Sequence, residues 1–436
     1  MNSTRWIFLS LMALLICGAP ASQAQAPASP PAKSPTLEER LAGRAAENRY
    51  AVSYQNGAFS GPGWERLVEE GKKSRFFLVG EEHGVAEIPA VVRELFRTLQ
   101  PAGYRHLAIE ISSPMAAALD ETARGADGLQ KLSRFFQEYP PGVAFFTLKE
   151  EAGLLVAARA TVPGKEPVLW GLDYEITADR YLLEGVRRRA PEGPARAAVE
   201  KLYEQSAAAW KTVSETKNPG AFFSFANSPD IFKELRQAWP KPDPESAWAL
   251  DVIEETLAIN QMFVTNRNWE SNERRAKLNR RSFLRYWNEV KGQSAPPRVM
   301  FKFGASHMIR GRNVTEVFDL GNLASEMAAA EGSQSFHLLV VGGAGTQHAV
   351  FNPMELRYVP APVDLAEEEG LQPIVAQALP EGFTLIDLRP LRPLLSAART
   401  KTANPELMRI VHGFDAILIL TGSGPSRSLE PARTPR

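Results

Sequence analysis

Cysteine is almost absent from this sequence, since Cys17 is the only one among 436 residues. Cys17 lies in a segment that we predict to be removed on export, so the mature chain would hold neither a disulfide nor a thiolate nucleophile. Any nucleophile, general base or metal ligand must then be a His, Asp, Glu, Ser, Thr or Tyr side chain. The sequence has only six histidines, so the position of each one is informative.

A net charge and a long hydrophobic run are missing as well. The 50 basic and 50 acidic residues cancel and form no block of one sign, so a nucleic acid is not an expected partner. An apolar run over residues 6–16 is too short to cross a bilayer, and no transmembrane span is expected in the mature chain. A balanced surface fits a small-molecule or peptide substrate better.

The N-terminal residues are typical of an export signal. Arg5 precedes the apolar run, and a small-x-small cleavage site follows at residues 22–24, so we expect residues 1–24 to be a signal peptide. The mature protein is then periplasmic or extracellular. Lipid attachment at Cys17 is not expected, because Ile16 stands where a small residue is needed.

Composition predicts one folded domain between two loose ends. We expect residues 25–48, which start as an Ala/Pro/Ser-rich run, to be a disordered linker, and residues 423–436 to be a disordered tail. Residues 49–422 are long for a single domain, but acceptable for a sheet domain that carries a large insertion.

Short apolar runs rich in Val, Ile, Leu and Phe predict buried strands at 76–79, 107–111, 168–172, 299–303, 337–341 and 416–420, with a weaker one at 384–388. Apolar residues at helical spacing over residues 87–99 predict a helix between the first two strands, which is typical of a right-handed crossover. The expected fold is therefore α/β, with a mostly parallel sheet flanked by helices.

The strand signal stops after Leu172, and residues 177–290 show only helical patterns. We interpret this stretch as an all-helical insertion that acts as a cap over the carboxyl edge of the sheet, where it would exclude water and shape a pocket. The alternative is a separate helical domain docked elsewhere.

Two predicted strands end in a glycine followed three residues later by a histidine, His83 in one case and His307 in the other. The spacing itself occurs four times against a chance expectation of about 0.4, so the strand context must discriminate between the copies. The copy ending at His106 precedes a strand rather than following one. Residues just past the carboxyl ends of parallel strands face the ligand crevice, so His83 and His307 are expected to share one site.

Carboxylates accompany the first of these turns. Glu81 and Glu82 flank His83, and a neighbouring carboxylate raises the basicity of an imidazole and holds its tautomer, as a general base requires. We predict Glu81 and His83 to be catalytic and Glu82 to contact substrate. The alternative is a histidine that caps the next helix beside two solvated acids.

Other strand ends add further candidates. Glu110 lies near the end of an apolar strand, where a buried carboxylate needs a cation or histidine as partner, and we predict it to be catalytic together with His307. Asp173 follows the third strand and is either a substrate contact or an ordinary helix N-cap. Arg310 follows His307 and either binds an anion or oxyanion or is a surface charge.

A third histidine, His348, follows another strand in a glycine-rich turn. It either contacts substrate or belongs to a mobile loop. With His83, His307 and Glu110 it would also make a plausible shell for a divalent metal, although no tight ligand pair supports this. The basic stretch over residues 267–285 either grips an anionic ligand or is a solvated helix face, and the solvated face is favoured.

These motifs together resemble those of the superfamily of erythromycin esterase-like proteins, ChaN-like haem-binding proteins and Tiki/TraB proteins. They are Gly-Glu-Glu-His-Gly at residues 80–84, Leu-Ala-Ile-Glu at 107–110, Gly-Leu-Asp at 171–173 and Gly-Ala-Ser-His at 304–307. Residues 413–419 resemble the last strand of the esterase-like group. The resemblance covers roughly residues 76–420, interrupted by the helical insertion.

The resemblance implies an esterase-like hydrolase, in which water attacks an ester or related acyl bond with His83 as general base and needs no cofactor. The esterase pattern usually has two residues between its Glu and His, whereas only Glu82 separates Glu81 from His83, so activity on erythromycin itself is not expected. The shorter form resembles the ChaN-like branch, which implies haem or porphyrin binding. The paired Gly-x-x-His motifs resemble Tiki/TraB proteins and imply a metallopeptidase with a divalent metal.

Overall fold

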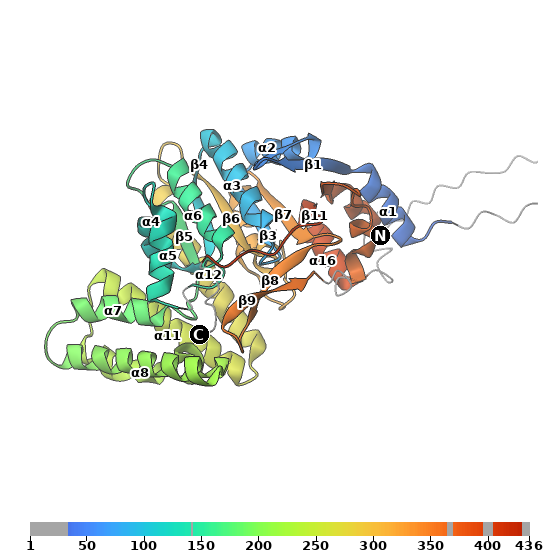
Figure 1. Cartoon of the computed structure of the whole chain (residues 1–436). Helices are drawn as coiled ribbons and strands as arrows, with labels where there is room; N and C mark the ends of the chain where they lie inside the picture. Colours follow the sequence, from blue (N-terminus) through green and yellow to red (C-terminus); the bar gives the residue numbers. More distant parts are fainter. Residues whose placement is uncertain (1–33, 141–142, 364–368, 396–403, 430–436) are drawn as a thin grey trace, which may run out of the picture. The chain divides into compact units, whose positions relative to one another are not determined.

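A nine-stranded sheet organises the described residues of the computed structural model, which are 34–140, 143–363, 369–395 and 404–429 (Figure 1). Its strands follow the order β2-β1-β10-β11-β7-β3-β6-β4-β5. Six neighbours run parallel, namely β11 (Ala416–Leu420), β7 (Ser335–Gly342), β3 (Phe76–Glu81), β6 (Arg298–Gly304), β4 (Tyr104–Ser112) and β5 (Leu169–Asp173). The antiparallel strands β10 (Phe383–Asp387), β1 (Arg49–Gln55) and β2 (Ala58–Ser60) complete one edge.

The predicted fold class is confirmed, because each of the seven expected strands forms and the sheet is mostly parallel. Strands β1 and β2 and the separate hairpin of β8 (Gln347–Asn352) and β9 (Arg357–Pro362) are not predicted from the sequence. These strands lack a continuous buried run, since most of their residues are exposed or half-buried. Apolar runs therefore could not reveal them.

Helices cover both faces of the sheet, because alternate residues of each strand point to opposite faces. Phe77 and Val79 of β3 pack toward α2 (Pro62–Lys73), α3 (Glu87–Leu99), α4 (Ser113–Thr122), α5 (Gly128–Glu138) and α6 (Lys149–Thr161). Phe76 and Leu78 face α1 (Leu37–Glu47), α12 (Asn268–Val290), α14 (Leu320–Ala330), α15 (Gln372–Val375) and α16 (Pro405–Gly413). The sheet is thus the buried middle layer.

The described residues of the insertion, 177–290, contain only helices. They are α7 (Asp179–Arg189), α8 (Pro194–Thr216), α9 (Phe223–Ala226), α10 (Lys233–Ala238), α11 (Pro244–Val264), α12 and two short 3-10 turns. Helix α7 contacts α8 and α11, which are coloured green to yellow in Figure 1, and α12 packs against β5. No helix in the described part of the chain is long and apolar enough to span a membrane.

Two segments expected to be disordered have defined structure. Helix α1 lies within the predicted linker 25–48 and buries Leu41 and Ala45 against the sheet layer. Residues 423–429 of the predicted tail are paired: the Ser426 N–H donates to the Gly84 carbonyl at 2.8 Å and the Lys149 N–H to the Arg427 carbonyl at 2.7 Å. Composition could not reveal these backbone pairings. The predicted signal peptide, residues 25–33 of the predicted linker and residues 430–436 lie outside the described residues.

Candidate active site

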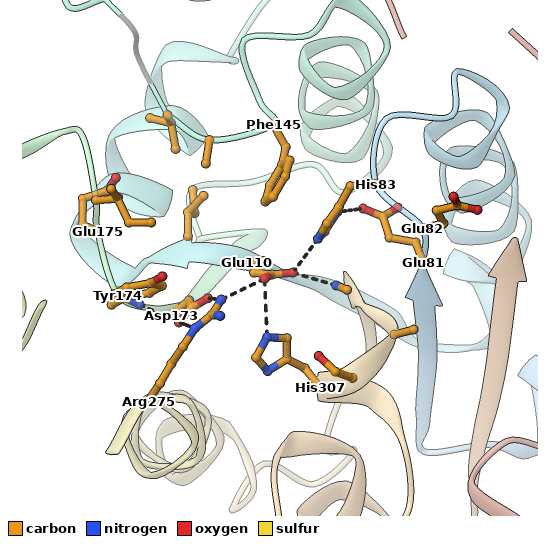
Figure 2. Close-up of a pocket in the computed structure, with 17 residues that line it drawn as sticks. Glu81, Glu82, His83, Glu110, Phe145, Asp173, Tyr174, Glu175, Arg275 and His307 are labelled. Carbon is orange, nitrogen blue, oxygen red and sulfur yellow. Dashed lines mark hydrogen bonds and ion pairs between the residues drawn. The ribbon is translucent and has the colours of Figure 1, made fainter. Parts of the chain in front are cut away.

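The carboxyl ends of β3, β4, β5 and β6 surround a cavity of about 520 Å³ (Figure 2). Parallel strands end on the same edge of a sheet, so side chains distant in sequence meet there. The cavity is lined by residues 81–83, Glu110, Ile111, residues 143–145 and 173–176, Arg275 and residues 304–307. The insertion contributes Arg275 of α12 to this wall.

His83 lies between two carboxylates. Its Nδ1 is 2.8 Å from Oε1 of buried Glu81, and its Nε2 is 3.5 Å from Oε2 of Glu110 (Figure 2). Because an ionised carboxylate only accepts hydrogen bonds, Nδ1 of His83 carries a proton, and Nε2 is directed at Glu110, which lines the cavity. Phe145 stacks on the imidazole with ring centres 3.9 Å apart, which holds the ring orientation.

His307 forms a second pair of the same kind. It lies in the short helix α13 (Ala305–Met308) directly after β6, and its Nδ1 is 2.7 Å from Oδ2 of buried Asp319. Its Nε2 is 3.5 Å from Oε1 of Glu110. The two imidazoles therefore approach the two oxygens of one carboxylate, and the structure brings His83, His307, Glu81 and Glu110 together.

Glu110 is held as an anion at the centre of this arrangement. Its Oε2 accepts the Gly304 N–H at 2.6 Å, and its Oε1 accepts a hydrogen bond from Arg275 Nη2 at 2.9 Å. Burial by itself raises the pKa of Glu110, but His83, His307 and Arg275 together lower it to about 2. Glu110 is therefore ionised at neutral pH.

The same charges act on the two histidines. Burial lowers the pKa of His83, but the carboxylates of Glu110 and Glu81 outweigh it and raise the pKa above its ordinary value. Burial and Arg275 lower the pKa of His307, whereas Asp319 and Glu110 raise it, with a net increase. Both imidazoles thus hold a proton to a higher pH than a free histidine does.

Arg275 is the cation of the site, and Arg310 is not. Arg275 makes a bidentate ion pair with Asp173 and also reaches Glu110. The prediction for Arg310 is wrong, because its guanidinium binds Asp415 at 2.8 Å and the Ser335 carbonyl at the amino end of β7. That is the opposite edge of the sheet from the cavity. Adjacency to His307 in sequence did not place the two side chains together.

Of the other predicted substrate contacts, Glu82 and Asp173 line the cavity and His348 does not. Glu82 lines the cavity, and its Oε2 accepts the Gly342 N–H at 3.1 Å. Asp173 also lines it, but its oxygens are taken up by Arg275 and the Tyr174 N–H. His348 is not among the lining residues of the cavity. It lies on β8 with Nδ1 3.4 Å from Glu82 Oε1.

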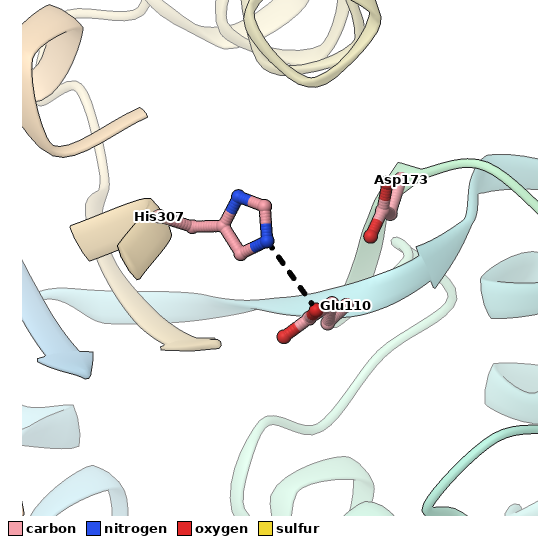
Figure 3. A group of neighbouring side chains, drawn as sticks. All are labelled: Glu110, Asp173 and His307. Atoms are coloured by element: carbon pink, nitrogen blue, oxygen red, sulfur yellow. Dashed lines mark ion pairs between the residues drawn. The ribbon is translucent and has the colours of Figure 1, made fainter. Parts of the chain in front are cut away.

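A metal shell of His83, His307, His348 and Glu110 does not form, because His348 does not line the cavity and its Nδ1 pairs with Glu82 instead. Figure 3 shows a different group, in which ligand atoms of Glu110, Asp173 and His307 lie within 4.8 Å of one another. The guanidinium of Arg275 already binds both carboxylates of this group. The residues therefore do not fit a divalent cation, whose charge would be placed beside that of Arg275.

Several residues of the site were missed from the sequence. Arg275 lies in the basic stretch 267–285, for which the sequence favours a solvated helix face, and nothing in the local pattern distinguishes it from Arg274. Lys302 in the middle of an apolar strand did carry a signal, since a buried lysine needs an anionic partner. Asp319 and Phe145 lie in segments without a motif, and only the tertiary fold brings them to the histidines.

Solved structures share this fold. A structural-genomics protein from Bacillus cereus has 14% sequence identity and a TM-score of 0.57, covering 90% of this chain and 100% of its own. The erythromycin esterase EreC, a mutant in its open conformation, has 14% identity and a TM-score of 0.56, covering 88% and 100%. A succinoglycan biosynthesis protein has 13% identity and a TM-score of 0.56, covering 91% and 100%.

Sequence comparison adds no closer relative, because no protein-family model and no curated protein matches this chain. At identities of 13–14% the structural likeness shows the fold alone. The chain thus has the α/β fold that the erythromycin esterase and the succinoglycan biosynthesis protein also have.

Proposed function

Starting from a fold shared with an erythromycin esterase, we propose that this protein is a hydrolase that uses water to cleave an ester or related acyl bond. We also propose that it acts after export, in the periplasm or outside the cell, on a small molecule or a peptide. The observation that carries the proposal is the pair of histidines in one cavity. Each directs Nδ1 at a buried carboxylate and Nε2 at Glu110.

In this proposal His83 is the general base. Its side chain is 28% exposed, so its Nε2 reaches cavity water, and Glu81 fixes the tautomer. Nε2 takes a proton from water while the water oxygen bonds to the acyl carbon. The resulting imidazolium returns that proton to the leaving alkoxide when the tetrahedral intermediate collapses. Glu110, 3.5 Å from Nε2, stabilises the imidazolium between these two steps.

His307 takes the second role. It is more buried than His83, with 9% of its side chain exposed, and Asp319 and Glu110 favour its protonated form. A protonated imidazole donates from Nε2 to the oxyanion of the tetrahedral intermediate, as an oxyanion-hole donor does. Arg275 orients Glu110 and neutralises Asp173 rather than contacting the reacting atoms.

The test is turnover of a broad panel of esters and thioesters by the purified protein and by His83→Ala and His307→Ala. We expect each variant to lower kcat/KM at least a hundredfold. His412→Ala is the matched control, since His412 is exposed on α16 away from the cavity. If His83→Ala hydrolyses the panel as fast as the unmodified protein, the assignment of the base is wrong.

The haem and metallopeptidase alternatives have less support from the site. Carboxylates dominate the cavity wall, and its arginine is already paired with two of them, so an anionic porphyrin meets repulsion. Titration with haemin distinguishes this alternative, because a haem-binding protein gives a Soret shift that is lost in a histidine variant. Elemental analysis of protein purified without a histidine tag tests for a stoichiometric metal.

A further inference from the structure

A buried lysine lies behind the proposed base. Lys302 occupies the middle of β6 and is 3% exposed. Its Nζ donates to Glu81 Oε1 at 2.6 Å and to Glu151 Oε1 at 2.7 Å. Glu81 Oε1 is also the atom that His83 Nδ1 contacts, so one carboxylate oxygen joins the lysine to the base. Burial of an ammonium without such partners costs free energy, so Lys302 must become buried together with Glu81 and Glu151.

Glu151 forms the far end of this chain of contacts. It lies in the first turn of α6 and is 2% exposed, and its second oxygen, Oε2, has no hydrogen-bond partner among the described residues. A buried carboxylate oxygen without a donor favours a bound proton. Burial and Glu81 raise the pKa of Glu151, Lys302 opposes this, and the result is about 7. Its charge therefore changes near neutral pH.

In the other carboxylate–histidine pair, Asp319 and His307, a helix start holds the carboxylate in place of a lysine. Asp319 Oδ1 accepts the Leu320 N–H at 2.7 Å, so the partner of His307 is held by the start of a helix. Glu81 is held by an ammonium instead, and Lys302 lowers its pKa against the effect of burial. Glu81 therefore stays a carboxylate when His83 changes its protonation state.

We infer that Lys302 and Glu151 are positioning residues for the proposed hydrolysis, which hold Glu81 as a fixed acceptor of the His83 Nδ1 proton. His83 Nε2 then keeps the free lone pair that takes the proton from water. This inference rests on the proposed function for its catalytic consequence, but the network itself is testable without turnover. The charged groups around His83 are Glu81, Glu110 and Lys302, and those around Glu151 are Lys302, Glu81 and His83, with Tyr358 beside it.

The experiment follows the titration of His83 by NMR of the histidine Cε1–H groups. Only six histidines are present, and the His83→Asn spectrum identifies the signal of His83. Glu151→Gln keeps an oxygen for Lys302 but removes the negative charge that Glu151 carries when it is ionised, so the pKa of His83 should fall by several tenths of a unit to about one unit. Glu150→Gln is the control, since Glu150 is the preceding residue and pairs with exposed Arg427.

Turnover is measured on the same proteins. Lys302→Met should lower kcat at least tenfold with little change in KM, because substrate contacts remain, and Glu151→Gln should shift the pH profile of kcat/KM to lower pH. If Lys302→Met does not fold, Glu151→Gln carries the test, since it leaves the ammonium partnered.

An unchanged His83 titration in Glu151→Gln would overturn the inference. If the titration shifts while no ester is hydrolysed by any of the proteins, the charge network stands and the proposed function fails.

Discussion

Removal of the Arg275 guanidinium is predicted to destabilise the fold in a pH-dependent way. Arg275→Met leaves Glu110 and Asp173 side by side, with only 9% and 2% of their side chains exposed and without their shared cation. Removal of one partner from a buried ion pair typically costs about 3–5 kcal/mol, because the remaining charge has no compensation. The part of this cost that comes from Glu110 should vanish where Glu110 becomes protonated.

The contribution of Glu110 gives the magnitude. His83, His307 and Arg275 together lower its pKa from an ordinary 4.5 to about 2. At 1.36 kcal/mol per unit this corresponds to about 3 kcal/mol. A carboxylate with a lowered pKa in the folded state stabilises fully above its unfolded pKa, and this stability is lost as the pH falls through the folded pKa. Because Arg275 lowers this pKa together with the two histidines, the variant should lose up to about 3 kcal/mol through Glu110 at pH 7, and the difference should shrink as the pH falls from about 4.5 to about 2.

Urea unfolding followed by far-UV circular dichroism at several pH values measures this difference. Arg274→Met is the matched control on the same helix, because Arg274 is 39% exposed and pairs with Glu255 at the surface. Such a pair contributes less than about 1 kcal/mol. If Arg275→Met unfolds at the same urea concentration as Arg274→Met at pH 7, the account of the charge balance at Glu110 is refuted.

Three further predictions concern activity. The kcat/KM of the unmodified protein should rise with pH through a midpoint above 6.5, because His83 acts only when unprotonated and its pKa is raised. Glu110→Gln should move that midpoint to lower pH, because the Glu110 carboxylate raises the pKa of His83. An unmoved midpoint would exclude this effect of Glu110 on His83. Deletion of residues 423–436 should lower both the melting temperature and kcat, since it removes the backbone bonds to Gly84, which follows His83, and to Lys149, two residues before Glu151. Scanning fluorimetry and turnover would show no change if the segment were dispensable. Dialysis against EDTA should leave ester turnover unchanged, because Arg275 supplies the positive charge beside Glu110, whereas loss of activity restored by a divalent metal would support the metallopeptidase alternative.

Local patterns in the sequence determined the sheet and part of the site. Runs such as residues 76–79 and 416–420 are apolar throughout because both faces of the sheet are covered there, and this predicted the strands directly. His83, His307 and Glu110 were found because the carboxyl ends of parallel strands share one edge. Each of these inferences needs only residues close together in the chain.

The rest of the site depends on contacts between distant segments. Arg275 and Arg274 are adjacent on one helix, and only the rotation of α12 against β5 sends one into the cavity and the other to Glu255. Arg310 follows His307 by three residues, yet the chain leaves α13 in an extended conformation at Ile309 and carries it to the opposite edge. The positions of the Arg275 and Arg310 side chains therefore cannot be predicted from the residues next to them in the sequence.

The central claim is that an imidazole at position 83 takes a proton from water in this cavity. Its most direct test is kcat/KM of His83→Ala toward an ester of the panel, measured with and without added imidazole. We predict a loss of at least a hundredfold and partial recovery with imidazole, since the truncated side chain enlarges a cavity already of about 520 Å³. Undiminished turnover by His83→Ala would contradict the claim.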